Sequence, residues 1–308
     1  MNKDRFHGII PALITPYTED GDISEPVTRR LVRHLLSKGV TGFYLSGSTG
    51  EGFLQSIEER KKFLQIVLDE VRGAVPVIAH IGAMDTRTCT ELARHAAKAG
   101  ADAVSAVPPF YYRHGPEQIR QHYLDIVRAA DIPLIIYHIP ELTGVKASVD
   151  FYRELSRVDG IIGIKFTSKD MYEMQQILDV CGEDFLVFNG PDECCLAGLA
   201  TGACGAIGST YNIMPEKFMA LYRHVREGRL QEARAIQFEV NRLIRELLKY
   251  DFIAFEREIL RLQGFDVGNP RKPLQQLTDA QRGEIRAIAE RFPFLGVREA
   301  EEAGPAGA

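Results

Sequence analysis

The feature that most constrains the fold of this chain is its alternation of short β-branched runs with longer amphipathic stretches. The runs are candidate strands at Ile9–Ile14, Val40–Leu45, Val75–Ile81, Ala103–Val107, Pro133–Tyr137, Ile161–Lys165, Phe185–Phe188 and Ala203–Ile207. Candidate helices follow them at Pro26–Lys38, Ser56–Val71, Thr86–Ala99, Pro116–Ala130, Ser148–Arg157, Lys169–Val180, Asp192–Ala200 and Pro215–Glu227. Such alternation is typical of an α/β fold with a parallel sheet, and eight strand–helix units predict a closed (β/α)8 barrel, or TIM barrel.

An open, doubly wound sheet is the alternative α/β architecture. Its dinucleotide-binding version opens the first helix after a strand with a G-x-G-x-x-G motif, and the sequence has no such motif there. We therefore favour the closed barrel.

The strand pattern stops at about Gly228, and helical periodicity continues over Leu230–Tyr250, Phe252–Gln263 and Thr278–Arg291. We expect residues 1–227 to form the barrel and carry the active site. Residues 228–308 are expected to form a C-terminal helical extension packed on the barrel as part of one structural unit. The tail Arg298–Ala308 is rich in Glu, Ala, Gly and Pro, and we expect it to be frayed.

Composition excludes several classes of protein. The 308 residues are 45% apolar and 26% charged, as in ordinary globular proteins. The net charge of −5 does not favour binding to nucleic acid or to an anionic membrane surface. No signal peptide or apolar run near about 18 residues is present. The five cysteines form no C-x-x-C pair, so we expect free thiols, no metal site and a cytoplasmic location.

Lys165 is a charged residue at the end of an apolar stretch, Gly160–Thr167, that is typical of a short buried strand. An ammonium is costly to desolvate, so lysine is almost never fully buried unless it is paired. Desolvation favours the neutral amine, which attacks carbonyls, and Lys165 is therefore a candidate Schiff-base nucleophile. The alternative is a strand-end lysine whose ammonium extends into water.

Further residues follow neighbouring strands at the edge where barrel enzymes carry their chemistry. After the second strand, Ser48 and Thr49 lie between glycines, where backbone N–H groups and hydroxyls can hold a carboxylate or phosphate, although an ordinary turn fits as well. Tyr137 ends the fifth strand and either moves protons beside Lys165 or packs with a satisfied hydroxyl. Together with a Schiff-base lysine, these residues suggest a site for an α-keto acid.

Thr167 lies two residues beyond Lys165, on the same side if the strand continues. Asp192 and Glu193 open a predicted helix, where they either cap its N-terminus or accept hydrogen bonds from a polyol in the pocket. The histidines show no metal-ligand spacing, so no metal site is predicted.

In these segments the chain resembles the pyruvate-dependent class I aldolase family of N-acetylneuraminate lyase and dihydrodipicolinate synthase. The resemblance runs from Gly8–Pro16 to Arg271–Pro273, nearly the whole chain, in family order and spacing. Ser48 and Leu142 are similar to the lyase branch, because the synthase branch carries a second threonine and a carboxylate-binding arginine at these places. The segment Gly205–Asn212 also follows the lyase pattern.

The resemblance implies reversible cleavage of sialic acid, N-acetylneuraminate, to N-acetylmannosamine and pyruvate. It implies that Lys165 forms the Schiff base, that Tyr137 moves protons, and that Ser48 and Thr49 hold the pyruvyl carboxylate. The residues implied to contact the sugar hydroxyls are Thr167, Gly190, Asp192, Glu193 and Ser209. Tyr111 is similar to a tyrosine that reaches a neighbouring subunit's site, which implies a homotetramer. No metal or organic cofactor is implied, and the expected partners are small molecules.

The chain departs from the family pattern at His138, Glu141 and Pro191, and the last two bear on the preferred sugar or its N-acyl group. The alternative enzyme is another pyruvate aldolase, acting on a 2-keto-3-deoxy sugar acid or, less favoured, making dihydrodipicolinate. A non-catalytic ligand-binding barrel is the alternative from a different class, because a fold does not guarantee a function.

Overall fold

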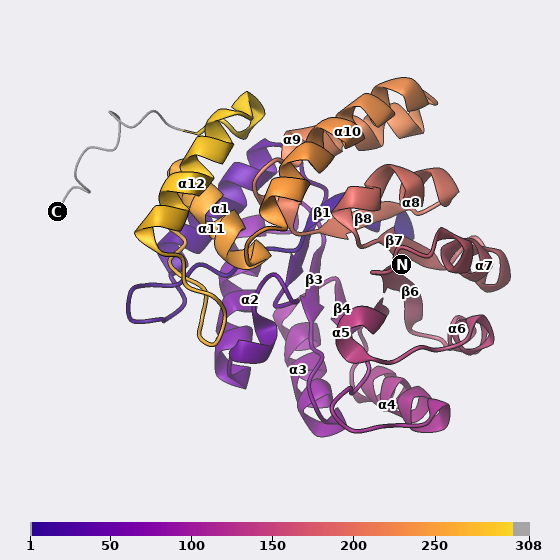
Figure 1. Ribbon diagram of the computed structural model, residues 1–308. Coiled ribbons are helices and arrows are strands. Elements are labelled where there is room, and N and C mark those ends of the chain that lie inside the picture. Colours follow the sequence, from indigo (N-terminus) through magenta and orange to yellow (C-terminus); the bar gives the residue numbers. More distant parts are fainter. Residues whose placement is uncertain (1, 298–308) are drawn as a thin grey trace.

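Eight parallel strands form a closed barrel in the computed structural model, which describes residues 2–297 (Figure 1). The strands are β1 (Gly8–Pro11), β2 (Phe43–Leu45), β3 (Val77–His80), β4 (Ala103–Ala106), β5 (Leu134–His138), β6 (Ile161–Phe166), β7 (Leu186–Asn189) and β8 (Gly205–Gly208). They pair in the order β1-β8-β7-β6-β5-β4-β3-β2. The sheet closes between β1 and β2, where the Leu13 N–H donates to the Tyr44 carbonyl at 2.9 Å. The predicted (β/α)8 barrel is confirmed.

Helices follow the strands; most of them cover the outside of the barrel, and a four-residue helix after β5 lies at its mouth. They are α1 (Glu25–Ser37), α2 (Ile57–Val71), α3 (Thr86–Ala99), α4 (Pro116–Ala129), α5 (Pro140–Thr143), α6 (Val149–Leu155), α7 (Met171–Cys181), α8 (Cys195–Thr201) and α9 (Pro215–Arg226). Local sequence explains their ends: Ser56 and Glu59 form a reciprocal capping box at the start of α2, and Gly100, at φ 90°, ends α3. Helix α5 was not predicted, because a four-residue helix is too short for its periodicity to be recognised.

Strand alternation sorts side chains into two hydrophobic cores. Phe43, Leu45 and Ile164 pack outward against the helices, in the larger core between sheet and helices. Tyr44 and Tyr137 belong to the smaller core inside the barrel, as their positions in the two-residue period require. A charged side chain that points into the barrel is therefore surrounded by the apolar side chains of this inner core.

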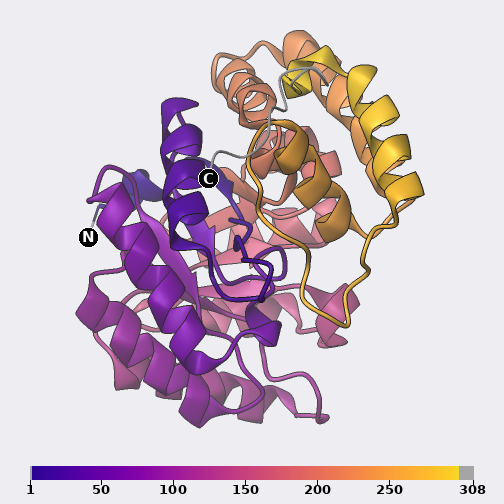
Figure 2. The same cartoon turned by 90° about the vertical axis from the view of Figure 1, so that its left-hand side faces the viewer.

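The predicted C-terminal extension consists of α10 (Leu230–Leu247), α11 (Phe252–Leu262) and α12 (Asp279–Glu290). Figure 2 shows these helices, in orange to yellow, gathered on one side of the barrel. Helix α10 packs along α9, and α11 packs against the turn after β8 and against α12. The tail Arg298–Ala308, which we expected to be frayed, lies outside the described residues.

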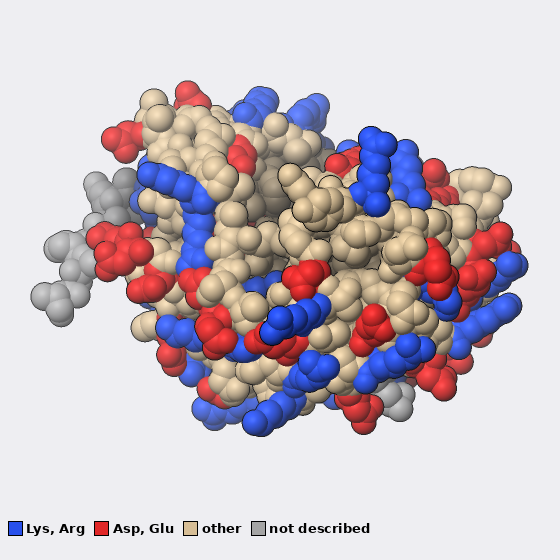
Figure 3. Space-filling view, turned by 90° about the horizontal axis from the view of Figure 1, so that it is seen from below, with Lys and Arg blue, Asp and Glu red and all other residues tan. Residues whose placement is uncertain are grey.

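The surface carries no large patch of one charge on the face shown in Figure 3, where Lys and Arg side chains are interspersed with Asp and Glu. All five cysteines are free thiols. Within residues 2–297, none of the helices combines the length and hydrophobicity that crossing a membrane requires.

Candidate active site

Lys165 lies near the end of β6, directly beside Tyr137 of β5 in the strand register. Its side chain points into the lumen, and the residue is only 4% exposed. The Nζ atom lies 4.2 Å from the ring centroids of both Tyr44 and Tyr137. Two aromatic faces at this distance attract a cation by about 2 kcal/mol or more when it is desolvated. The lysine is thus a buried amine between two phenols, and its ammonium does not extend into bulk water.

The two tyrosines beside Lys165 are held by further lumen residues. Their rings meet edge to face at 82°, and the Tyr44 hydroxyl donates to Ser105 Oγ at 3.0 Å. Burial raises the pKa of Tyr44 well above its usual value, so this phenol stays protonated. The His80 ring packs edge-on against Tyr137, and burial holds the pKa of His80 well below its ordinary value.

Neither Tyr44 nor His80 was singled out from the sequence. A usable signal was present, because Tyr44 is a hydroxyl-bearing residue at the inward position of an otherwise apolar strand. What the sequence could not supply was the closeness of Tyr44 on β2 to Lys165 on β6, because these strands face each other across the lumen without pairing.

Ser48 and Thr49 lie in the loop after β2, and both line the same cavity as Lys165. The loop is sharply folded: Ser46 and Glu51 adopt left-handed backbone angles, with φ of 53° and 57°. Gly52 is required there, because a Cβ at this position would lie 1.9 Å from the Ser46 carbonyl oxygen. The backbone of this loop is therefore tightly constrained, and Ser48 and Thr49 project from it into the cavity that Lys165 also lines.

The cavity over Lys165 has a volume of about 350 Å³. It is lined by nearly all the residues that the sequence singled out: Ser48, Thr49, Tyr137, Lys165, Thr167, Gly190, Asp192, Glu193 and Ser209. Tyr111 is the exception. It lies in the loop after β4, is 75% exposed, and meets the ring of Tyr112 edge to face at 5.1 Å.

Asp192 is a buried carboxyl in the cavity wall. Its Oδ2 accepts hydrogen bonds from the Thr210 N–H at 2.8 Å and the Thr210 hydroxyl at 2.7 Å, while Oδ1 has no partner among the described residues. Burial raises the pKa of Asp192 to about 6, against the lowering effect of the Thr210 hydrogen bonds. Its side chain does not cap the helical segment that it opens, so the predicted capping role is wrong for this residue.

Helix α10 holds the loop that carries Asp192. The Gln237 amide donates to the Asp192 carbonyl at 3.1 Å, and the Asn241 amide donates to the Glu193 carbonyl at 3.0 Å. On the opposite side, Gly208 leaves room for the carboxyl, because a Cβ there would lie 1.7 Å from Asp192 Oδ1. The C-terminal extension thus helps to shape the pocket.

Two more groups define the polar end of the cavity. The Thr167 hydroxyl is buried without a hydrogen-bond partner in the described structure, and Gly190 approaches it so closely that a Cβ would lie 2.0 Å away. Glu193 lies nearer the rim, where its Oε1 is 3.1 Å from the Lys169 ammonium. Lys169 was not among the residues that the sequence singled out.

Of the three departures noted in the sequence, Glu141 and Pro191 line the cavity and His138 does not. His138 points outward from β5 and stacks on Phe166, with centroids 5.0 Å apart. Its Nδ1 lies 2.7 Å from the Tyr152 hydroxyl, and burial lowers its pKa to about 4. The histidine therefore belongs to the packing outside the lumen. In the described part of the chain, no group of three or more His, Cys, Asp or Glu side chains is placed to hold a metal ion.

A parallel barrel with a buried lysine between phenols at its mouth is the arrangement of a (β/α)8 carbon–carbon lyase of the aldolase type. The chain belongs to the dihydrodipicolinate synthetase family, whose profile matches residues 5–292.

Known proteins similar to this chain include both branches of that family. N-acetylneuraminate lyase of Rhizobium meliloti (strain 1021) is 38% identical over 296 residues, which cover 96% of this chain and 97% of the relative. A sialic acid aldolase of Ruminococcus gnavus, solved as a catalytic lysine mutant, superposes with a TM-score of 0.92 at 34% identity, covering 96% and 97% of the two chains. A dihydrodipicolinate synthase of Aquifex aeolicus superposes with a TM-score of 0.91 at 28% identity, covering 96% and 100%.

Proposed function

We propose that this protein is a class I aldolase that cleaves N-acetylneuraminate reversibly to N-acetylmannosamine and pyruvate. The observation that carries the proposal is the buried Lys165 amine, 4.2 Å from the ring centroids of Tyr44 and Tyr137 at the base of a cavity. The identity to N-acetylneuraminate lyases over most of the chain supports this choice of substrate.

The Lys165 amine attacks the C2 ketone of open-chain sialic acid to give a carbinolamine, and loss of water gives a protonated Schiff base. Tyr137 donates the proton that leaves with this water. Its phenolate then takes the proton of the C4 hydroxyl as the C3–C4 bond breaks. The bond's electrons enter the Schiff base and leave an enamine, with N-acetylmannosamine as the aldehyde product. Protonation at C3 and hydrolysis release pyruvate and restore the amine.

The carboxylate of the keto acid is held by Ser48 and Thr49. Their hydroxyls and the N–H groups of the folded loop provide donors at the cavity wall, where a carboxylate is favoured. This clamp fixes the ketone against Lys165, and such positioning supplies much of an aldolase's rate enhancement.

The hydroxyl chain of the sugar lies along Thr167, Gly190, Asp192, Glu193 and Ser209. Thr167 Oγ1 and Asp192 Oδ1 are buried without partners in the described structure. Buried polar atoms are nearly always hydrogen-bonded in a working protein, and both residues line the cavity, so we expect these two side chains to turn toward a polyhydroxylated ligand.

The protonated Schiff base serves as the electron sink, so the proposed reaction needs neither a metal nor an organic cofactor. We further propose that the enzyme works in the cytoplasm as a homotetramer, in which the exposed Tyr111 meets a neighbouring subunit's site. Analytical ultracentrifugation tests the tetramer, and a monomer at working concentration would contradict it.

The first experiment is to incubate the purified protein with N-acetylneuraminate and measure pyruvate. We expect pyruvate and N-acetylmannosamine in equal amounts. A parallel reaction with pyruvate and borohydride should label Lys165 irreversibly. Labelling of Lys165 without sugar cleavage would support a Schiff-base aldolase but contradict N-acetylneuraminate as its substrate. A folded protein that is not labelled would instead be a non-catalytic ligand-binding barrel.

A second candidate is another pyruvate aldolase of the same family, acting on a 2-keto-3-deoxy sugar acid. The ion pair between Glu193 and Lys169 favours it, because the pair occupies one of the two carboxylates expected to accept hydrogen bonds from a long polyol. Leu142, exposed at the cavity rim, argues against dihydrodipicolinate synthesis, because the synthase branch of the family has a carboxylate-binding arginine at this position. Product identification with a panel of aldehydes and pyruvate separates these candidates.

A further inference from the structure

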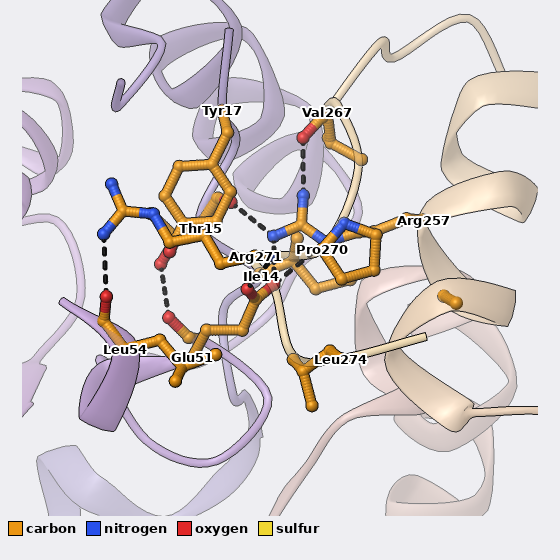
Figure 4. A network of polar contacts seen from close by, with 12 residues as sticks. Ile14, Thr15, Tyr17, Glu51, Leu54, Arg257, Val267, Pro270, Arg271 and Leu274 are labelled. Atoms are coloured by element: carbon orange, nitrogen blue, oxygen red, sulfur yellow. Dashed lines mark hydrogen bonds and ion pairs between the residues drawn. The ribbon is translucent and has the colours of Figure 1, made fainter. Parts of the chain in front are cut away.

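A buried ion pair joins helix α11 of the extension to the loop that carries Ser48 and Thr49. Arg257 Nε lies 3.0 Å from Glu51 Oε1, and both residues are 3% exposed. The two residues are 206 positions apart in the chain. Figure 4 shows the arginine reaching from the extension across to this carboxylate.

Arg257 is itself fixed in place on several sides. Its Nη1 donates to the Val267 carbonyl at 2.5 Å, and its Nη2 donates to the Thr15 carbonyl at 2.8 Å and to Glu51. The second Glu51 oxygen, Oε2, accepts a hydrogen bond from the backbone N–H of Arg271 at 2.8 Å (Figure 4). The guanidinium thus uses its planar fork to bind one carboxylate and two carbonyls at once, a pattern that lysine cannot reproduce.

Glu51 is also the residue that closes the loop. Its φ of 57° is left-handed, a conformation that a residue with a Cβ keeps only where its surroundings fix it. Its N–H donates to the Ser48 carbonyl at 3.0 Å, and the Gly52 N–H donates to the Gly47 carbonyl at 3.1 Å. Whatever holds the Glu51 side chain therefore also holds the turn from which the Ser48 and Thr49 hydroxyls project.

We propose that Arg257 is a positioning residue for the carboxylate of the α-keto acid, acting through Glu51 on Ser48 and Thr49. This inference rests on the proposed function, because it assumes that these two residues bind that carboxylate. It makes the C-terminal extension a part of the pyruvate site, although Arg257 itself does not line the cavity.

The competing explanation is that the pair only fastens the extension to the barrel. Glu258, the next residue on α11, provides the matched control. It is 1% exposed, and it pairs with Arg261, with Nε to Oε2 at 2.9 Å, and with Arg282. Its described hydrogen bonds and ion pairs do not reach the loop, so disrupting this pair loosens the extension and leaves the loop's own anchor in place.

The test compares three variants of the full chain. Arg257→Lys keeps the charge and loses the fork. The double variant Glu51→Gln with Arg257→Met removes both charges, so that it avoids an unpaired buried charge, which is the change most costly to folding. Glu258→Gln disrupts the neighbouring pair. For each variant, the pyruvate concentration that gives half-maximal borohydride labelling of Lys165 is measured, together with the KM and kcat for cleavage.

We expect the double variant to need about tenfold more pyruvate for half-maximal labelling, with KM affected more than kcat, and Arg257→Lys to fall between it and the wild type. Glu258→Gln should stay within about twofold of the wild type even if its melting temperature falls. An unchanged double variant, or an equal shift in Glu258→Gln, would overturn the proposal.

Hydrogen–deuterium exchange separates failure of this inference from failure of the proposed function. Faster exchange over residues 47–52 is expected in the double variant and not in Glu258→Gln. If the wild type is not labelled by pyruvate, the proposed function fails, and exchange alone decides whether Arg257 holds the loop. Equal exchange in both variants would then overturn that role as well.

Discussion

Lys165 Nζ lies 4.2 Å from the ring centroids of Tyr44 and Tyr137 and lines the cavity, where a substrate carbonyl can reach it. Replacing Lys165 with alanine removes the nucleophile and little packing. We expect Lys165→Ala to lower turnover by at least about 10³-fold and to abolish borohydride trapping, with a cooperative thermal transition retained.

Lys169→Ala is the control for this prediction. Lys169 also lines the cavity, but it lies at the rim and its ammonium pairs with Glu193. Trapping at Lys165 should persist in Lys169→Ala. Turnover in Lys165→Ala near that of the wild type would show that the reaction does not pass through a Schiff base on this residue.

Asp192 gives a prediction about pH. Its pKa, raised to about 6 by burial, means that the carboxylate is present above pH 6 and is protonated below it. Because the ionised group accepts more hydrogen bonds from a polyol, the KM for N-acetylneuraminate should rise as pH falls from 7 to 5. Asp192→Asn is always neutral and should have a high KM that does not change over this range.

The pyruvate half-reaction is the internal control for Asp192. Half-maximal trapping in Asp192→Asn should match that of the wild type, since the group lies at the sugar end of the cavity. A KM that changes with pH equally in both proteins would assign the titration to another group.

At the scale of elements, helix α11 places three consecutive charged residues in the interior. Arg257 and Glu258 have ion-pair partners, whereas both oxygens of Glu256 are buried without a hydrogen-bond partner in the described structure. Burial, first of all, raises the pKa of Glu256 well above its usual value; Asp192 and Asp251 add to this, and Ser209 and Arg257 oppose it. Burial therefore favours the neutral acid form of Glu256 over its carboxylate in the folded chain.

This makes α11 sensitive to pH. The unfolded chain ionises Glu256 at the ordinary carboxyl pKa, while the folded chain keeps the proton to higher pH. The stability that Glu256 contributes is thus complete below the ordinary pKa and is lost as pH rises through the folded value. We expect Glu256→Gln to lose less stability than the wild type between pH 5 and pH 8, with a melting temperature roughly 2–4 °C higher at pH 8. Parallel melting curves of the two proteins over this range would contradict the assignment.

The elements were predictable from the sequence where a local pattern marks them. The eight strands are apolar runs, often bounded by glycine, and helix α12 begins with the Thr278–Gln281 capping box. The cluster of site residues was also predictable, because parallel strands bring their carboxyl ends to one edge of the barrel. Tyr44, Lys169 and Arg257 were not, because their roles depend on contacts across the lumen, at the rim and between distant segments, and no local pattern records these.

At the scale of the whole molecule, we propose that the barrel of residues 1–227 and the extension of residues 228–308 are one folding unit with the active site in the barrel. Extension residues hold the barrel loops through Gln237, Asn241 and Arg257. Ile244, Leu247 and Phe252 also line the cavity itself. A barrel that folds independently buries its apolar surface under its own helices. In this protein, part of the barrel surface is buried only by the extension.

A chain that ends at residue 227 tests this proposal. It would expose the surface now covered by fully buried side chains of the extension: Val240, Leu243, Phe255, Ile259 and Leu260. Each contributes about 1.5–3 kcal/mol by burial, so these five alone amount to roughly 7–15 kcal/mol, comparable to the whole stability of a typical protein. We therefore expect the 1–227 chain to show no cooperative thermal transition and no near-ultraviolet circular dichroism. A sharp transition close to that of the full chain would mean that the barrel folds alone and that the extension is a separate addition to the site.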